Sequence, residues 1–288
     1  MLTAERESAQ RPRQRDGSLL RYPEDRIPVV IFFTFFAADL MVWAFSKTWW
    51  FPVLWCVAGF IPKGWVCSWN HNHQHVNMFK SPFLNRVLEL GFALQTGVTT
   101  NAWLLHHVLG HHLNYLEPLK DESGWMNPDG TSMGMWEYTW KNTLAAYPRV
   151  WQVGGKHPQH RRVFFWGFVT TALVLMALIE RHPYNAIFVY VIPMFVSLAG
   201  TIWVTWFHHA NLPTDNAMVA STNTLDPLYN FFTGNLGYHT AHHYRQALHW
   251  SKLPQLHAEL EGRIPASTYL EAGFPINWMR KVLGPHKR

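Results

Sequence analysis

The sequence IPVVIFFTFFAADLMVWAFS, residues 27–46, is almost wholly apolar. A helix of about 20 such residues is long enough to span the hydrocarbon core of a bilayer. Three more apolar runs follow, at residues 49–69, 163–179 and 184–207. Only short polar turns, residues 47–48 and 180–183, separate the members of each pair. The chain is therefore predicted to be an all-α integral membrane protein with four transmembrane helices in two hairpins.

Three local features modify this prediction. The first run contains one ionisable residue, Asp39, which we expect at a helix end or facing the bundle. Pro62, Lys63 and Gly64 interrupt the second run, so its inner end is expected to leave the bilayer early. Residues 82–98 are shorter and amphipathic, which favours an interfacial or re-entrant helix over a full span.

The distribution of basic residues predicts the orientation. The two outer turns carry only Lys47, Glu180 and Arg181, and most Lys and Arg lie on the opposite side. The positive-inside rule then makes that side, with both termini, cytoplasmic. Residues 1–26 are predicted to be a polar tail without a signal peptide, residues 27–260 the membrane domain and residues 261–288 a C-terminal tail. We expect a bacterial inner membrane.

The composition supports a membrane protein and argues against several other classes. Charged residues make up 15% of the chain, against about 25% in typical soluble domains. The 16 tryptophans are typical of membrane–water interfaces. The net charge of +6 is spread among acidic neighbours, so nucleic-acid binding is not expected. The two cysteines, Cys56 and Cys67, form neither a CxxC motif nor a disulfide framework.

Histidine is the most informative residue type, with 18 in the chain. Most of them gather where the predicted spans meet the polar segments, in three clusters and one pair. On a helix, residues three or four apart lie on one face, and neutral imidazole is the commonest protein metal ligand. The predicted metal ligands are His71 and His75; His107, His111 and His112, beside Gly110; His239, His242 and His243; and one of His208 and His209.

Nine histidine ligands exceed the four to six that one ion takes, so the spacing predicts two metal ions. Imidazole binds Zn, Cu, Fe and Ni alike, and spacing alone does not select among them. Ligating histidines commonly donate their second N–H to a carboxylate, for which the candidates are Glu117, Asp121, Asp215 and Asp226. We expect His73 to lie behind the ligands or at the surface, and His106 to point about a quarter-turn away. The histidines outside the clusters are treated as ordinary polar residues: His157, His160, His182, His249, His257 and His286.

The motifs His71-x-x-x-His75, His107-x-x-x-His111-His112 and His239-x-x-His242-His243 resemble, in this order, the three histidine boxes of the membrane fatty acid desaturase and hydroxylase superfamily. The resemblance covers roughly residues 27–260. It implies two iron ions held by the box histidines and by one more histidine after the last span, for which His209 is favoured over His208.

The same resemblance implies the reaction partners. O₂ is the co-substrate, and the substrate is an acyl chain or a similar apolar molecule reaching the site along a tunnel between helices. Electrons come from a separate ferredoxin, rubredoxin or cytochrome b5-type donor with its reductase. The chain has neither a His-Pro-Gly-Gly haem motif nor a rubredoxin-like cysteine pair of its own.

Two activities within the superfamily remain open, with desaturation of an acyl chain preferred. The third box, followed by WSKLP at residues 250–254, is similar to acyl-lipid desaturases. The second box, with three residues before its histidine pair, is more similar to alkane hydroxylases. A histidine-rich metal transporter is a distant alternative, because it would need ionisable residues near the middle of the spans and only Asp39 is available there.

Overall fold

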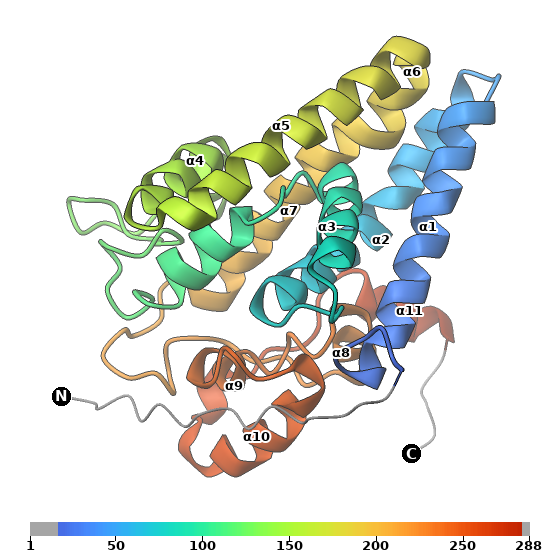
Figure 1. Ribbon diagram of the computed structural model, residues 1–288. Coiled ribbons are helices and arrows are strands. Elements are labelled where there is room, and N and C mark those ends of the chain that lie inside the picture. Colours follow the sequence, from blue (N-terminus) through green and yellow to red (C-terminus); the bar gives the residue numbers. More distant parts are fainter. Residues whose placement is uncertain (1–16, 284–288) are drawn as a thin grey trace.

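The computed structural model describes residues 17–283, which form a helical structure without a β-strand (Figure 1). The α-helices are α1 (Arg26–Phe45), α2 (Trp50–His75), α3 (Pro82–Thr96), α4 (Met135–Lys156), α5 (Pro158–Arg181), α6 (Pro183–Ala186), α7 (Ile192–His209), α8 (Pro227–Thr233), α9 (His239–Tyr244), α10 (Leu253–Leu260) and α11 (Ile276–Leu283). The π-helical segments are η2 (Leu104–His111) and η3 (Ile187–Val191). Short 3₁₀ turns are η1 (Pro23–Asp25), η4 (Trp250–Lys252), η5 (Glu261–Arg263) and η6 (Ala266–Thr268).

Four segments are long and apolar enough to cross a membrane, which confirms the predicted number of spans. They are Pro23–Phe45, Trp50–His75, Pro158–Arg181 and Pro183–His209. The last of these consists of α6, η3 and α7. Each predicted apolar run falls within or close to one of these segments. The prediction succeeds because a helix that spans the bilayer core needs about 20 apolar residues, and such runs are visible in the sequence.

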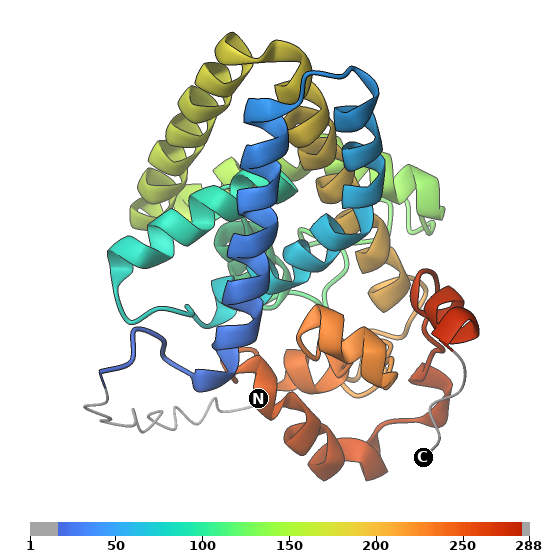
Figure 2. The same cartoon turned by 90° about the vertical axis from the view of Figure 1, so that its right-hand side faces the viewer.

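The two hairpins turn at the same end of the bundle, at the top of Figure 1. The Tyr184 hydroxyl donates to the Trp49 carbonyl at 2.9 Å, and the Asn185 amide donates to the carbonyls of Trp43 and Ser46 at 2.9 and 3.1 Å. Helices α8, α9 and α10 lie at the opposite end in both views (Figures 1 and 2). The polar C-terminal part of the chain therefore caps the ends of the spans that lie opposite the hairpin turns.

Helix α2 links the second apolar run to the first histidine cluster. It continues without a break through Pro62, Lys63 and Gly64, where the run was expected to leave the bilayer early, and reaches His75. The Lys63 side chain is 1% exposed and lies inside the bundle. Its ammonium group lies 3.1 Å from the Asp39 carboxylate, which is 0% exposed, and donates to the Val189 carbonyl at 2.6 Å.

The Asp39 carboxylate is the centre of a buried polar network. Of the two positions expected for Asp39, a helix end or a place facing the bundle, the structure shows the second. It accepts from Trp55 Nε1 at 2.7 Å and from Gln95 Nε2 at 2.9 Å, besides pairing with Lys63. The network joins α1, α2, α3 and η3 in a region from which water is excluded. A buried ion pair of this kind fixes how helices pack, because misaligned packing would leave a charge unpaired.

Helix α3 has 15 residues, is absent from the four candidate spans and packs against α2, α5 and α7. Its N-terminus is capped by the Ser81 hydroxyl, which accepts from the Leu84 amide. It ends at Gly97, whose φ of +69° suits glycine; a Cβ there would lie 2.4 Å from the Met194 carbonyl oxygen. The polar segment that follows η2 contains α4, which packs along α5 and α7.

Residues 17–25, part of the segment expected to be a tail, dock against the C-terminal third. Asp25 is buried, accepts from Trp250 Nε1 at 2.8 Å and pairs with His249 Nε2 at 3.2 Å. His249 also stacks on Tyr22, with ring centroids 3.9 Å apart. These contacts hold the beginning of α1 against the segment that follows the third histidine cluster.

The buried ion pair gives the first prediction. Asp39→Ala leaves the Lys63 ammonium without its carboxylate in a dry environment, and should lower the free energy of unfolding by about 3–5 kcal/mol. Unfolding of the purified protein in mixed micelles measures this change. Leu40→Ala, next in the chain at an exposed position, is the matched control and should lower the free energy of unfolding much less.

A double variant, Asp39→Ala with Lys63→Met, should recover part of the lost stability. An Asp39→Ala protein as stable as the Leu40→Ala control would show that the ion pair is dispensable.

Candidate metal centre

The structure brings all ten predicted ligand histidines together at the end of the bundle opposite the hairpin turns. They come from four elements far apart in the sequence: the end of α2, η2 with the residue after it, the end of α7, and α9. Nine of the ten side chains are buried, and His75 is half-buried. A single chamber thus collects residues separated by up to 172 positions, since it joins His71 to His243.

Five of these histidines form a first group: His71, His75, His107, His112 and His242. One ring nitrogen from each lies within 4.8 Å of the others. His107 Nε2 lies 2.8 Å from His71 Nε2 and 2.9 Å from His112 Nε2. As predicted from their spacing, His71 and His75 share one face of α2.

A second group consists of His111, His209 and His243, whose ring nitrogens also lie within 4.8 Å of one another. His239 adjoins this group, because its Nε2 lies 3.0 Å from His209 Nε2 and 3.2 Å from His243 Nε2. The two groups are in contact. The ring of His112 in the first group stacks on that of His243 in the second, with centroids 4.2 Å apart.

The tenth histidine, His208, lies outside both groups. Its ring stacks on His239 with centroids 4.2 Å apart. Both His208 and His209 line the cavity described below, but only His209 belongs to the second group.

The second histidine cluster adopts a local structure that the sequence did not predict. We expected His107 and His111 to share a face of an α-helix, but this segment is the π-helix η2. The His112 amide accordingly bonds to the His107 carbonyl, five residues back, at 2.9 Å. The wider turn places His112 with His107 in the first group and directs His111 to the second. Such π-helical turns are rare in proteins, and those that do occur are frequently found at functional sites.

Helix α9 divides its histidines between the two groups in a similar way. It has only six residues, and His239 and His243 reach the second group while His242 reaches the first. Thr240 on the opposite side fixes the helix: its amide donates to Asn223 Oδ1 at 3.1 Å, and its hydroxyl accepts from Asn223 Nδ2 at 2.8 Å. One short helical turn therefore bridges both groups.

Hydrogen bonds on the outer side of several rings direct the remaining nitrogen inward. His111 Nδ1 donates to the Asp121 carboxylate at 2.8 Å, and His209 Nδ1 donates to the Ala220 carbonyl at 3.1 Å. His71 Nδ1 donates to Asn72 Oδ1 at 3.2 Å. Partners of this kind fix the tautomer and orientation of metal-ligating histidines.

Of the four candidate carboxylates, only Asp121 contacts a clustered histidine among the described residues. Glu117 forms a surface ion pair with Lys120. Asp226 caps α8 and pairs with Arg280, and Asp215 is exposed. The sequence placed Asp121 only ten residues from His111, but the loop that returns it to the ring could not be derived from spacing.

The donor set fits metal ions. The Nε2 atoms of His75, His111 and His242 are buried and have no hydrogen-bond partner in the described part of the chain. Leaving a buried polar atom without a partner costs about 1–3 kcal/mol. Two nitrogens bound side by side to one metal at ~2.1 Å are separated by ~3 Å, close to the spacings within each group.

Burial keeps these imidazoles neutral, as metal binding requires. It lowers the pKa of His242 well below its usual value, and the nearby His75 and His71 add to the effect. The pKa values of His107 and His112 are lowered in the same way, by burial first and by neighbouring imidazoles second. Around pH 7 the chamber thus offers uncharged nitrogen donors rather than a cluster of positive charges.

The other histidines have separate roles. His73 is fully buried rather than at the surface, and it bonds to Glu89 at 3.3 Å on the side away from the two groups. His106 is buried beside Trp103, and burial lowers its pKa to about 3. His249 and His257, also outside the two groups, bond to Asp25 and Tyr269. His157, His160 and His182 also lie outside the two groups, and His286 falls beyond the described residues.

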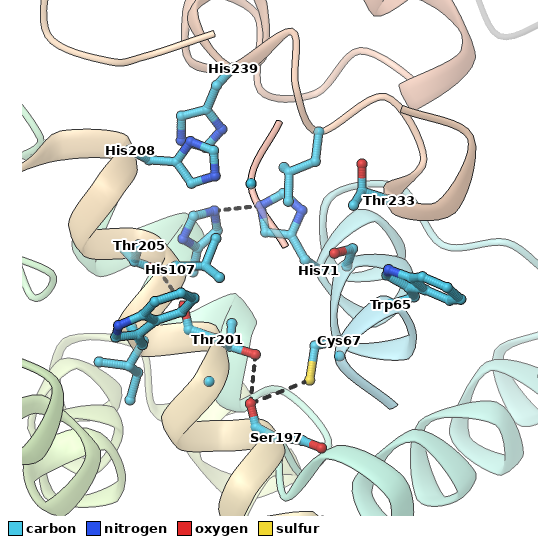
Figure 3. Close-up of a pocket in the computed structure, with 18 of the residues that line it drawn as sticks. Trp65, Cys67, His71, His107, Ser197, Thr201, Thr205, His208, Thr233 and His239 are labelled. Carbon is cyan, nitrogen blue, oxygen red and sulfur yellow. Dashed lines mark hydrogen bonds between the residues drawn. The ribbon is translucent and has the colours of Figure 1, made fainter. Parts of the chain in front are cut away.

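A cavity of about 310 Å³ leads to the two groups (Figure 3). One end is lined by His71, His107, His208, His209 and His239, and its walls are formed mainly by α2 and α7. In Figure 3, Trp65 and Cys67 lie on one side and Thr201 and Thr205 on the other. The threonine hydroxyls donate to carbonyls four residues back along α7, so the wall presents few free donors.

Two further residues at the site carried no signal in the sequence. Tyr115 packs on His243, with ring centroids 4.4 Å apart, and burial raises its pKa to about 12. Asn72 lies beside His71 and donates to the Gly234 carbonyl at 3.0 Å, which ties the end of α2 to the C-terminus of α8. Neither residue belongs to a recognisable motif.

Comparison with known proteins gives one family. The sequence profile described as fatty acid desaturase matches residues 47–273, most of the chain, which confirms the resemblance seen in the three histidine motifs. The matched range includes every histidine of the two groups. No curated protein matches the chain.

The contact between His111 and Asp121 yields a test of the site. Asp121→Asn should lower metal affinity by about 10- to 100-fold, because the amide does not hold the His111 ring in the required tautomer. Competition with a chelator, followed by elemental analysis, measures the affinity. Glu117→Gln removes a carboxylate from the same loop at an exposed position and should leave it unchanged. Equal affinities in the two variants would remove Asp121 from the site.

Proposed function

The chain belongs to the fatty acid desaturase family, and we propose that it is a diiron, O₂-dependent desaturase that introduces a double bond into an acyl chain. The observation that carries this proposal is the junction of the apolar cavity with the two histidine groups. Four of the nine imidazoles line the end of a channel between α2 and α7: His71 and His107 of the first group, and His209 and the adjoining His239 of the second. A long apolar substrate held there would have its chain beside the metal ligands.

Within the proposal, the first histidine group holds one iron ion and the second group, with His239, holds the other. His209 is assigned as the ligand from the α7 pair, because its ring reaches the second group while His208 stacks outside it. When bound, the two ions supply the redox chemistry that activates O₂. Asp121 and the Ala220 carbonyl orient His111 and His209.

The stoichiometry requires a reductant. Desaturation removes two hydrogens from adjacent carbons and, with O₂, two electrons and two protons, yields an alkene and two waters. Hydroxylation consumes the same inputs but inserts one oxygen atom and yields an alcohol and one water. We assign the electrons to a separate ferredoxin, rubredoxin or cytochrome b5-type protein with its reductase. The donor docks on the histidine side of the membrane, which the excess of Lys and Arg makes cytoplasmic.

Hydroxylation of an alkyl chain is the second candidate. The second histidine motif, with its three residues before the pair, favours it, whereas the third motif and the segment after it favour desaturation. The two outcomes differ in whether a second hydrogen leaves or an oxygen is transferred. We place the protein in the inner membrane of a bacterium, with its substrate drawn from the lipid phase.

Product analysis tests the proposed reaction. The protein is reconstituted in vesicles with O₂, a reduced donor and isotopically labelled acyl lipids, and products are identified by mass spectrometry. We expect products that have lost two hydrogens. Products that have gained an oxygen would replace desaturation by hydroxylation, and a failure to consume O₂ with either acyl lipids or alkanes would contradict both.

A histidine variant tests the ligand assignment. His242→Ala removes a nitrogen from the first group and should abolish product formation and deplete the bound metal, while the four spans keep the protein in the membrane. His160→Ala removes an exposed histidine outside both groups and should retain activity and metal. Full activity of the His242→Ala protein would exclude α9 from the ligand set.

A further inference from the structure

The cavity that leads to the histidines is open on one side. Gly64 of α2 and Gly200 of α7 both line it, and a Cβ at either position would meet no heavy atom within 4 Å. Gly64 is exposed. Both glycines lie within candidate membrane spans, so this side of the cavity faces lipid rather than water.

The segment that precedes α11 forms part of the same cavity wall. Gly273, Phe274, Pro275 and Ile276 all line it, and Ile276 is almost completely buried. Helix α11 is fixed at its inner side by an ion pair, in which Arg280 Nε donates to Asp226 Oδ2 at 2.6 Å. This helix therefore begins at the cavity and is anchored on the beginning of α8.

The outer face of α11 is apolar and exposed. Phe274, Trp278 and Val282 recur every four residues and are 70, 56 and 63% exposed. Trp278 and Val282 lie on one side of α11, opposite Ile276 and Arg280, and Phe274 is exposed in the turn that precedes the helix. Large apolar side chains gathered on one exposed face of a short helix indicate an interaction surface.

The position and charge of α11 indicate what covers this face. In both views α11 lies at the height of the first turns of α1, nearer the spans than α10 does (Figures 1 and 2). The sequence after Glu271 contains Arg280, Lys281, Lys287 and Arg288 but no acidic residue. Tryptophan beside basic residues on an amphipathic helix suits the headgroup layer, where Lys and Arg are attracted to anionic lipid.

We propose that α11 is a membrane-surface helix, with Phe274, Trp278 and Val282 immersed in the bilayer, and that it forms the outer rim of the cavity opening through which an apolar substrate arrives from the lipid. The location of α11 is independent of the reaction. The substrate role rests on the proposed function. In this arrangement an apolar substrate molecule enters the opening between α2 and α7 at the depth in the bilayer where α11 meets the lipid headgroups.

Spin labels test the location. Full-length protein with a single introduced cysteine is labelled, reconstituted in phosphatidylcholine and phosphatidylglycerol vesicles, and probed for accessibility to O₂ and to a water-soluble nickel chelate. The native Cys56 and Cys67 are both buried, and unsubstituted protein gives the background. Labels at Phe274→Cys, Trp278→Cys and Val282→Cys should favour O₂, as at the lipid-facing reference Leu40→Cys. Asn277→Cys should shift toward the chelate, and the α10 reference Glu259→Cys should favour the chelate.

Two results would overturn this location. Chelate access at residues 274, 278 and 282 equal to that at residue 259 would place α11 in water. Exclusion of both reagents would mean that protein, such as a second copy of the chain, covers this face. Neither result depends on catalysis, so both are distinguishable from a failure of the proposed function.

A kinetic comparison tests the role as a rim. Trp278→Glu places a carboxylate among the headgroups and should raise the KM for a bilayer-resident substrate about tenfold, equivalent to ~1.4 kcal/mol, with kcat and metal content retained. Asn277→Glu adds the same charge at the adjacent, exposed position and should leave KM unchanged. An unchanged KM in the Trp278→Glu protein would separate α11 from substrate access, even if the labels place it in the bilayer.

Discussion

The structure depends on one constraint: many imidazole nitrogens are buried close together, in two neighbouring groups. A buried nitrogen without a partner costs about 1–3 kcal/mol, and several inward-facing nitrogens lack one among the described residues. Protonation does not relieve this cost, because burial holds the pKa of these rings down. A bound metal ion would relieve it, and the surrounding structure presents the rings in a way that suits such an ion. Helix α2 continues past its apolar part to His75, η2 widens into a π-helix, and α9 ends after six residues.

The membrane part supplies the rigidity that such a site needs. The turns of the two hairpins are bonded to each other through Tyr184 and Asn185 at one end. The Asp39–Lys63 pair links α1, α2 and η3 in the middle. At the end opposite the hairpin turns, Asn72 and Asp25 tie the spans to the polar cap. These contacts hold α2 and α7 in position. The positions of the two helices in turn determine where their histidines lie and how the cavity walls are placed.

Much of the fold and of the candidate metal site was predictable from local sequence. The four spans followed from hydrophobic length, and the convergence of the histidine clusters followed from their positions at the ends of the spans. The interruption at Pro62, Lys63 and Gly64 predicted only an early exit of the second run from the bilayer. It gave no sign that Lys63 is buried against Asp39 within a helix that continues to His75. The π-helical geometry of η2 was not visible in the spacing, because the same spacing on an α-helix would pair His107 with His111. Asp121 and Asp25 act across loops and across the chain, and such pairings leave no periodic signal.

The central claim is that the two histidine groups form a dimetal centre of iron. Elemental analysis of the detergent-purified protein tests it most directly, because it requires neither a substrate nor an electron donor. The account predicts about two iron ions per chain, as expected for two sets of imidazole ligands. Zinc alone, found reproducibly and without iron, would contradict it and would remove the basis for both desaturation and hydroxylation.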